Sequence, residues 1–148
     1  MKTRFFILML FVLGCIILAF PAPVAATRPE TLTINADMWL IGDNSAAGSF
    51  ATSGLFVDLG SASESFFITA NTIHGVKTLV GAEGTITIDF QAQLTWTGPT
   101  SGVAQGQFVI ISGTGAYKKL HGVGETYAEL DLAIYHLVAT YTGTGHFD

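Results

Sequence analysis

Cysteine is almost missing from this chain of 148 residues: the only one is Cys15, in an N-terminal segment that we expect to be removed. The remaining sequence therefore excludes disulfide bonds, thiolate metal sites and a cysteine nucleophile. Basic residues are scarce too. Lys and Arg number six against eleven Asp and Glu, and Lys2 and Arg4 belong to the same segment. So acidic a chain has no basic patch to neutralise phosphates, which argues against nucleic-acid binding.

The first 26 residues have the pattern of a secretory signal peptide. Lys2 and Arg4 precede an unbroken apolar run, Phe5–Phe20, and small residues end the segment at Ala26. We expect cleavage after Ala26, which leaves one domain, 27–148, that is secreted or otherwise extracytoplasmic and does not span a membrane. Two alternatives stay open. The run could remain as an anchor, although it is short for a spanning helix, and a loose lipobox could place a lipid on Cys15.

Helical periodicity is also lacking, and apolar and polar residues instead alternate along most of residues 27–148. Such alternation is typical of strands with one dry and one wet face. The longest case is Thr85–Trp96, which has Ile86, Ile88, Phe90, Ala92, Leu94 and Trp96 on one face. Thr31–Leu40 alternates in the same way. Further strands are expected at Gly48–Val57, Glu64–Ile73, Gly75–Val80, Ala104–Ser112, Gly122–Leu130 and Ile134–Tyr141, with turn signals at 42–45, 58–61 and 98–102.

About eight strands with short connections predict an all-β fold, an eight-stranded antiparallel closed β-barrel. A barrel of this size is either filled by side chains or holds one small ligand. Two segments, Leu132–Tyr141 and Phe108–Ile111, are apolar on both faces. Because a strand with two apolar faces is covered on both, the outer face needs a partner, either a terminal segment or another subunit, and we expect a homo-oligomer.

Several glycines follow the apolar run Phe108–Ile111, which ends at Ser112. Gly113-Thr114-Gly115 follows it, then Tyr117, then Gly122 and Gly124. The loop lacks both the Walker pattern and G-x-G-x-x-G, so these residues predict a structural corner, with Tyr117 packed over the barrel end.

This block resembles the Gly-Thr-Gly-aromatic segment of the allene oxide cyclase and dirigent barrels, and of small secreted bacterial proteins that are similar to them. The resemblance implies an eight-stranded antiparallel barrel, often dimeric or trimeric. Plant members cyclise an unstable epoxide or steer the coupling of phenoxy radicals, in both cases by holding a reactive intermediate in a shaped apolar cavity. The matching residues are scaffold residues, so no catalytic side chain carries over.

The candidate catalytic residues are Glu125 and His136. If Glu125 points inward, desolvation raises its pKa into a useful acid–base range; alternation favours the outward orientation, in which it is solvated. His136 lies among apolar residues, which favours a hydrogen-bonded core or interface histidine over a proton-transfer role. Trp96, Tyr127 and Tyr135 are candidate ligand-binding aromatics.

The four histidines show no metal-ligand spacing, so neither a metal nor another cofactor is predicted. The sequence favours a binding module that holds a small apolar or aromatic ligand. A cyclase- or dirigent-type enzyme and a structural or interaction barrel with a filled core remain alternatives, and whether the protein is an enzyme stays open.

Overall fold

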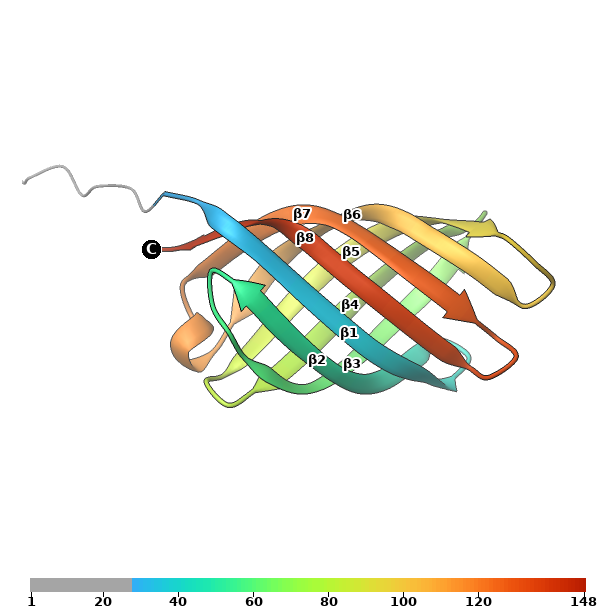
Figure 1. Ribbon diagram of the computed structural model, residues 1–148, viewed down its shortest axis with the longest axis horizontal. Helices are drawn as coiled ribbons and strands as arrows, with labels where there is room; N and C mark the ends of the chain where they lie inside the picture. Colours follow the sequence, from blue (N-terminus) through green and yellow to red (C-terminus); the bar gives the residue numbers. More distant parts are fainter. Residues whose placement is uncertain (1–27) are drawn as a thin grey trace, which may run out of the picture.

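Eight antiparallel strands form a closed barrel in the computed structural model, which describes residues 28–148 (Figure 1). The strands are β1 (Glu30–Gly42), β2 (Ser45–Gly54), β3 (Leu59–Thr69), β4 (Thr72–Gly81), β5 (Thr85–Trp96), β6 (Ser101–Gly113), β7 (Leu120–Asp131) and β8 (His136–Phe147). Each pairs with its neighbours in the sequence, and β1 pairs with β8 to close the ring. The predicted fold class is confirmed; the predicted signal peptide lies outside the described residues.

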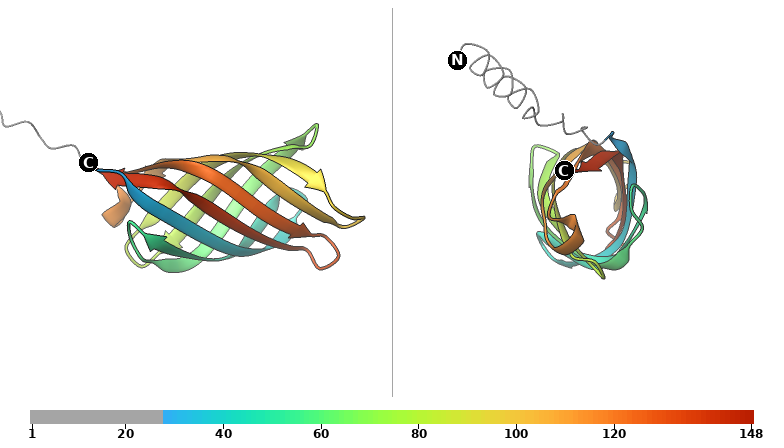
Figure 2. Two further views of the ribbon diagram at one scale, coloured as in Figure 1. Left: turned by 45° about the horizontal axis from the view of Figure 1, so that its top comes forward. Right: turned by 90° about the vertical axis from the view of Figure 1, so that its left-hand side faces the viewer.

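The barrel has two different ends. The connections β1–β2, β3–β4, β5–β6 and β7–β8 lie at one end, which we call the hairpin end. The other, the terminal end, carries the start of β1, the end of β8 and the 3-10 turn η2 (Gly115–Tyr117). The right-hand view of Figure 2 looks onto the terminal end and shows η2 beside the opening of the ring. Both ends matter below, because one is packed and the other is hollow.

Alternation along the strands separates an apolar interior from an outer wall on which polar and apolar side chains are mixed. On β5 Ile86, Ile88 and Phe90 are buried, as are Leu32 and Ile34 on β1. The outward positions of β5 and β8 carry mainly Thr and Gln side chains. No helix within residues 28–148 has the length and apolar character needed to cross a bilayer.

Strand bounds agree best where alternation is longest: β5 has the predicted ends, and β1 contains its predicted strand. The prediction of a strand at Glu64–Ile73 is wrong, because the chain reverses at Ala70 and Asn71, which have φ of 48° and 66°. Two successive residues with positive φ are characteristic of the tightest hairpins. β2 also begins and ends three residues before the predicted Gly48–Val57.

The expectation of a strand along Leu132–Tyr141 is only partly right. Its first four residues form the β7–β8 turn, in which Tyr135 has φ of 56°, and the strand itself begins at His136. The outward positions at the start of β8 are then His136, Val138 and Thr140, of which only Val138 is apolar. Exposed apolar side chains remain along this segment, with Ile134 and Tyr135 in the turn and Val138 on the strand.

Candidate functional site: a cavity in the barrel

A cavity of about 270 Å³ occupies the half of the barrel nearer the hairpin end. Its lining is mostly apolar and includes exposed residues of the hairpin end, such as Asp43 and Trp96, which place its mouth there. The lining residues are Leu40, Asp43, Glu64, Phe66, Ile68, Ile73, Phe90, Ala92, Leu94, Trp96, Ala104, Thr126, Ala128, Leu130, Leu132, Leu137, Ala139 and Tyr141. An apolar pocket with a few polar groups is the usual form of a small-molecule site.

Small side chains create the space. Ala104 on β6, Ala128 on β7, Ala139 on β8 and Ala36 on β1 are successive cross-strand partners. Across this row each strand contributes a single methyl group to the interior, and Ala104, Ala128 and Ala139 line the cavity. The cavity is thus a consequence of sequence at a few inward positions, and one larger side chain there would fill it.

Aromatic rings form the floor of the cavity, about halfway along the barrel. Phe108 and Phe90 each meet the ring of Tyr141 edge to face, with centroid distances of 5.3 and 6.2 Å. Glycines make room for them: a Cβ at Gly75 would overlap the Phe90 ring, and one at Gly124 would lie 2.8 Å from Phe108 Cε1. Edge-to-face packing of this kind fixes the rings more firmly than area burial alone.

A buried ion pair lies beside these rings. Glu64 on β3 and Lys77 on β4 are cross-strand partners, and Oε2 of Glu64 is 2.8 Å from Nζ of Lys77. Lys77 is fully buried; its Nζ also donates to Sδ of Met38 at 2.9 Å and lies 5.1 Å from the centroid of the Tyr141 ring. Burial lowers the pKa of Lys77, and the neighbouring Glu64 opposes that effect. Glu64 lines the cavity and Lys77 lies behind it.

Tyr141 is the other titratable group at the floor. Burial raises its pKa well above the ordinary value, and the charge of Glu64 adds to the rise, while a hydrogen bond with Thr126 acts in the opposite direction. The phenol is therefore protonated at any physiological pH. The floor thus offers a carboxylate and two hydroxyl groups in surroundings that are otherwise apolar.

The five residues singled out from sequence as chemical candidates do not form one site, although Glu125 and Tyr127 border the same open hollow on the outer wall. Trp96 is the only one that lines the cavity, at its mouth, where the indole is 46% exposed. Tyr135 is exposed in the β7–β8 turn at the same end. Tyr127 lies on the outer wall, where its hydroxyl donates to Oε1 of Glu129 at 3.1 Å.

The two catalytic candidates also face outward. Glu125 is exposed on the outer wall of β7, which is the orientation that alternation favours. His136 is half-buried on the outer side of β8: its Nε2 lies 2.6 Å from Oδ1 of Asp37, and its ring packs on Trp39 with 4.9 Å between centroids. Neither side chain reaches the cavity.

Sequence reasoning missed Glu64, Lys77 and Thr126. Each occupies an inward position of an alternating strand, and that position was the available signal: a polar or charged residue in phase with buried apolar neighbours, as Lys77 is with Leu79. What alternation does not give is the register between strands, so it could not show that Glu64 faces Lys77.

The terminal end is closed by residues from three connections. Tyr117 of η2 is buried, packs on Phe56 at a centroid distance of 4.8 Å and hydrogen-bonds Asp58.

The glycines predicted to be structural lie where a side chain would not fit. Gly115 has φ of 59°, and a Cβ there would overlap the carbonyl oxygen of Glu83. A Cβ at Gly113 would overlap the carbonyl oxygen of Tyr117. On β7 a Cβ at Gly122 would lie 2.7 Å from Cδ1 of Ile110.

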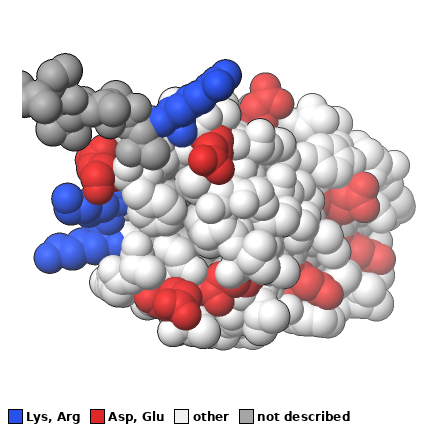
Figure 3. Space-filling model, turned by 60° about the vertical axis from the view of Figure 1, so that its left-hand side comes forward, with Lys and Arg blue, Asp and Glu red and all other residues white. Residues whose placement is uncertain are grey.

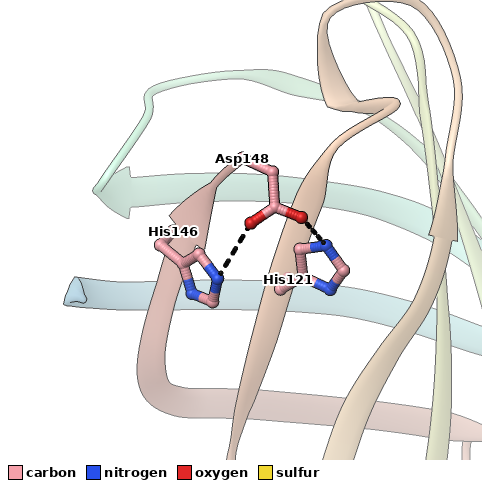
Figure 4. Close-up of polar contacts among 3 residues, drawn as sticks. All are labelled: His121, His146 and Asp148. Carbon is pink, nitrogen blue, oxygen red and sulfur yellow. Dashed lines mark hydrogen bonds and ion pairs between the residues drawn. The ribbon is translucent and has the colours of Figure 1, made fainter. Parts of the chain in front are cut away.

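A pair of histidines lies near the C-terminus. Figure 4 shows Asp148 reaching both His121 on β7 and His146 on β8, at 2.8 and 3.4 Å from their Nε2 atoms. The two imidazoles stack with 5.2 Å between centroids. Within residues 28–148, no group of three or more metal-binding side chains is arranged to hold a metal ion.

Charge is unevenly distributed over the surface. The exposed basic residues among 28–148 are Arg28, Lys118 and Lys119, which belong to the N-terminus and the β6–β7 connection. Figure 3 shows Lys and Arg gathered at the terminal end, while Asp and Glu are spread over the face in view. The cavity mouth, at the opposite end, has no basic side chain in its lining.

Comparisons with known proteins leave the barrel without an assigned family: no family model, curated protein or solved structure matches the chain significantly.

Proposed function

We propose that this protein is a secreted binding module whose barrel holds a small apolar or aromatic ligand. The observation that carries the proposal is the cavity in the hairpin half, apolar on most sides and about 270 Å³ in volume. An interior filled throughout by side chains would have favoured a purely structural barrel. The Gly-Thr-Gly-aromatic block supports a distant relationship to the allene oxide cyclase and dirigent barrels, whose ligands occupy such a cavity.

The size of the cavity sets the size of the ligand. A dry cavity of about 150 Å³ lined by Leu, Ile and Phe binds benzene. The present cavity is larger than that and smaller than most drug-binding pockets, which begin near 300 Å³. Two fused rings are therefore a good fit, and naphthalene is the simplest probe.

Calorimetric titration of purified protein into naphthalene tests the proposal. We expect saturable binding of one naphthalene per barrel. Ala104→Phe, which projects a ring into the cavity, should abolish the binding, and Ala51→Phe, the same change at an exposed position of β2, should leave it intact. Absence of binding to the wild-type protein, or equal binding to both variants, would contradict the proposal.

A further inference from the structure

Glu64 presents a carboxylate to a cavity that is otherwise almost entirely apolar. The residue is 8% exposed, and it belongs to the cavity lining. Its one ion-pair partner among residues 28–148 is Lys77, which contacts Oε2. A carboxylate accepts several hydrogen bonds through its two oxygens, so Oε1 is left to accept a donor that enters from the cavity.

Lys77 determines which kind of donor suits the site. The ammonium neutralises the carboxylate from behind, at 2.8 Å, and it is itself held by Met38 and the Tyr141 ring. The pair is therefore neutral overall, and a cationic ligand would bring an uncompensated charge into an apolar space. An anionic ligand would meet the carboxylate first. A neutral hydroxyl satisfies Oε1 without adding charge.

We infer that the cavity selects uncharged ligands of about two fused rings that carry one hydroxyl group, and that this hydroxyl donates a hydrogen bond to Glu64 at the cavity floor. The inference rests on the proposed function and names its ligand class. It gives Glu64 a role as a binding residue and Lys77 a role as the residue that positions and neutralises it.

Three probes of nearly the same shape separate the possibilities: naphthalene, 2-naphthol and 2-naphthoate, titrated at pH 7. An apolar cavity without an acceptor would prefer naphthalene, because a buried hydroxyl with no partner is costly. We expect the reverse here, with 2-naphthol bound about tenfold more tightly than naphthalene, a difference of about 1.4 kcal/mol. Binding of 2-naphthoate should be the weakest of the three.

The double variant Glu64→Leu with Lys77→Met removes the acceptor and keeps the fold. Replacing a buried ion pair by apolar residues of similar volume is often neutral or stabilising, whereas removing one partner alone strands a buried charge. The double variant should still bind naphthalene and should lose its preference for 2-naphthol. Glu125→Leu, which removes a carboxylate from the outer wall, is the matched control and should keep the preference.

Each outcome has one meaning. Naphthalene bound as tightly as 2-naphthol overturns the inference and leaves the proposed function standing, while no binding of either probe overturns both. A preference for 2-naphthoate would show that Lys77, not Glu64, meets the ligand. A preference that survives the double variant but disappears in Tyr141→Phe would assign the contact to the phenol and overturn the role of Glu64.

Discussion

The hydroxyl of Tyr117 donates a 2.6 Å hydrogen bond to Oδ2 of Asp58, although the two residues are 59 positions apart in the chain. The other oxygen of Asp58 accepts from the backbone N–H of Leu59 at 2.8 Å and of Ala82 at 3.3 Å. One carboxylate thus ties together the β2–β3 connection, the β4–β5 connection and η2 at the terminal end of the barrel.

Tyr117→Phe should lower the unfolding free energy at pH 7 by about 1.5–3 kcal/mol, the usual range for a hydrogen bond to a charged group. The bond from Tyr117 is the largest cause of the lowered pKa of Asp58. A lowered carboxyl pKa gives stability that is present above pH 3.8 and is lost as the pH falls below it.

Urea denaturation at pH 7 and pH 3 measures both effects. The wild-type protein should lose more stability between the two pH values than Tyr117→Phe does. Tyr127→Phe removes an exposed hydroxyl and serves as the control, which should behave as the wild type. Equal losses in all three proteins would show that the Asp58 contact contributes nothing.

Gly115→Val should destabilise the barrel by about 1–3 kcal/mol, because a β-branched residue is strained at positive φ. Gly115 has φ of 59°, and any Cβ there also meets the carbonyl oxygen of Glu83. Gly98→Val is the matched control, since a Cβ at Gly98 would be in ordinary contact, 3.8 Å from Ser101. Thermal melts compare the two. An unchanged melting temperature with altered ligand binding would instead make the Gly113–Gly115 loop a functional site.

Alkaline pH should unfold the protein in part through Tyr141. Its pKa is raised in the folded state, so the folded protein keeps a proton that the unfolded chain releases above the ordinary value of 10.0. Stability present below pH 10 is therefore lost as the pH rises further. Denaturation between pH 9 and pH 11 should show a shallower decline for Tyr141→Phe than for wild type; identical declines would contradict this.

The expected homo-oligomer remains a prediction, and the second segment named for it, Phe108–Ile111, offers the clearer surface. The run Phe108–Ile111 does have two apolar faces: Phe108 and Ile110 are buried, while Val109 and Ile111 are exposed beside Val123 of β7. Contiguous exposed apolar side chains of this kind usually mark an interface.

Light scattering on the wild type and on Val123→Lys tests this surface. If Val109, Ile111 and Val123 form the interface, the variant should have a lower assembly mass than the wild type. Val138→Lys, on the outer wall of β8 between Asp37 and Glu129, is the control and should assemble normally. A wild-type protein that stays monomeric at high concentration would contradict the predicted homo-oligomer.

Export should remove residues 1–26. Mass spectrometry of the protein recovered from outside the cytoplasm should then find Thr27 at the N-terminus. A diacylglycerol-modified Cys15 would show instead that the protein is a membrane-anchored lipoprotein, and an intact N-terminus would favour a retained anchor.

Period-two alternation was sufficient to predict the fold class, because strands such as β5 keep their dry and wet faces over their whole length. Turns were predicted only where several turn-forming residues stand together, as at 42–45, 58–61 and 98–102. The β3–β4 turn consists of Ala70 and Asn71, both at positive φ, and the β7–β8 turn consists of Leu132, Ala133, Ile134 and Tyr135. A turn marked by a single Asn and a turn of apolar residues both look like strands in sequence, so the ends of β3, β4 and β8 were misplaced.

The candidate site was harder to predict than the fold. Aromatic and acidic residues were chosen as candidates because their side chains can bind or react, yet Tyr127 and Glu125 lie on the outer wall. The cavity depends instead on alanines, whose methyl groups have no functional group to recognise in a sequence. Its one ion pair needs the register of β3 against β4. Cross-strand register depends on where turns occur, and so the missed β3–β4 turn also hid the partnership of Glu64 and Lys77.

The pairing of β1 with β8 joins the first described strand to the last, and this has a consequence for how the chain comes to be folded. Any partial product of synthesis or translocation has two open strand edges, and such edges invite pairing with other chains. Only the final strand removes both at once. A chain that folds only after all eight strands are available avoids the exposed intermediate.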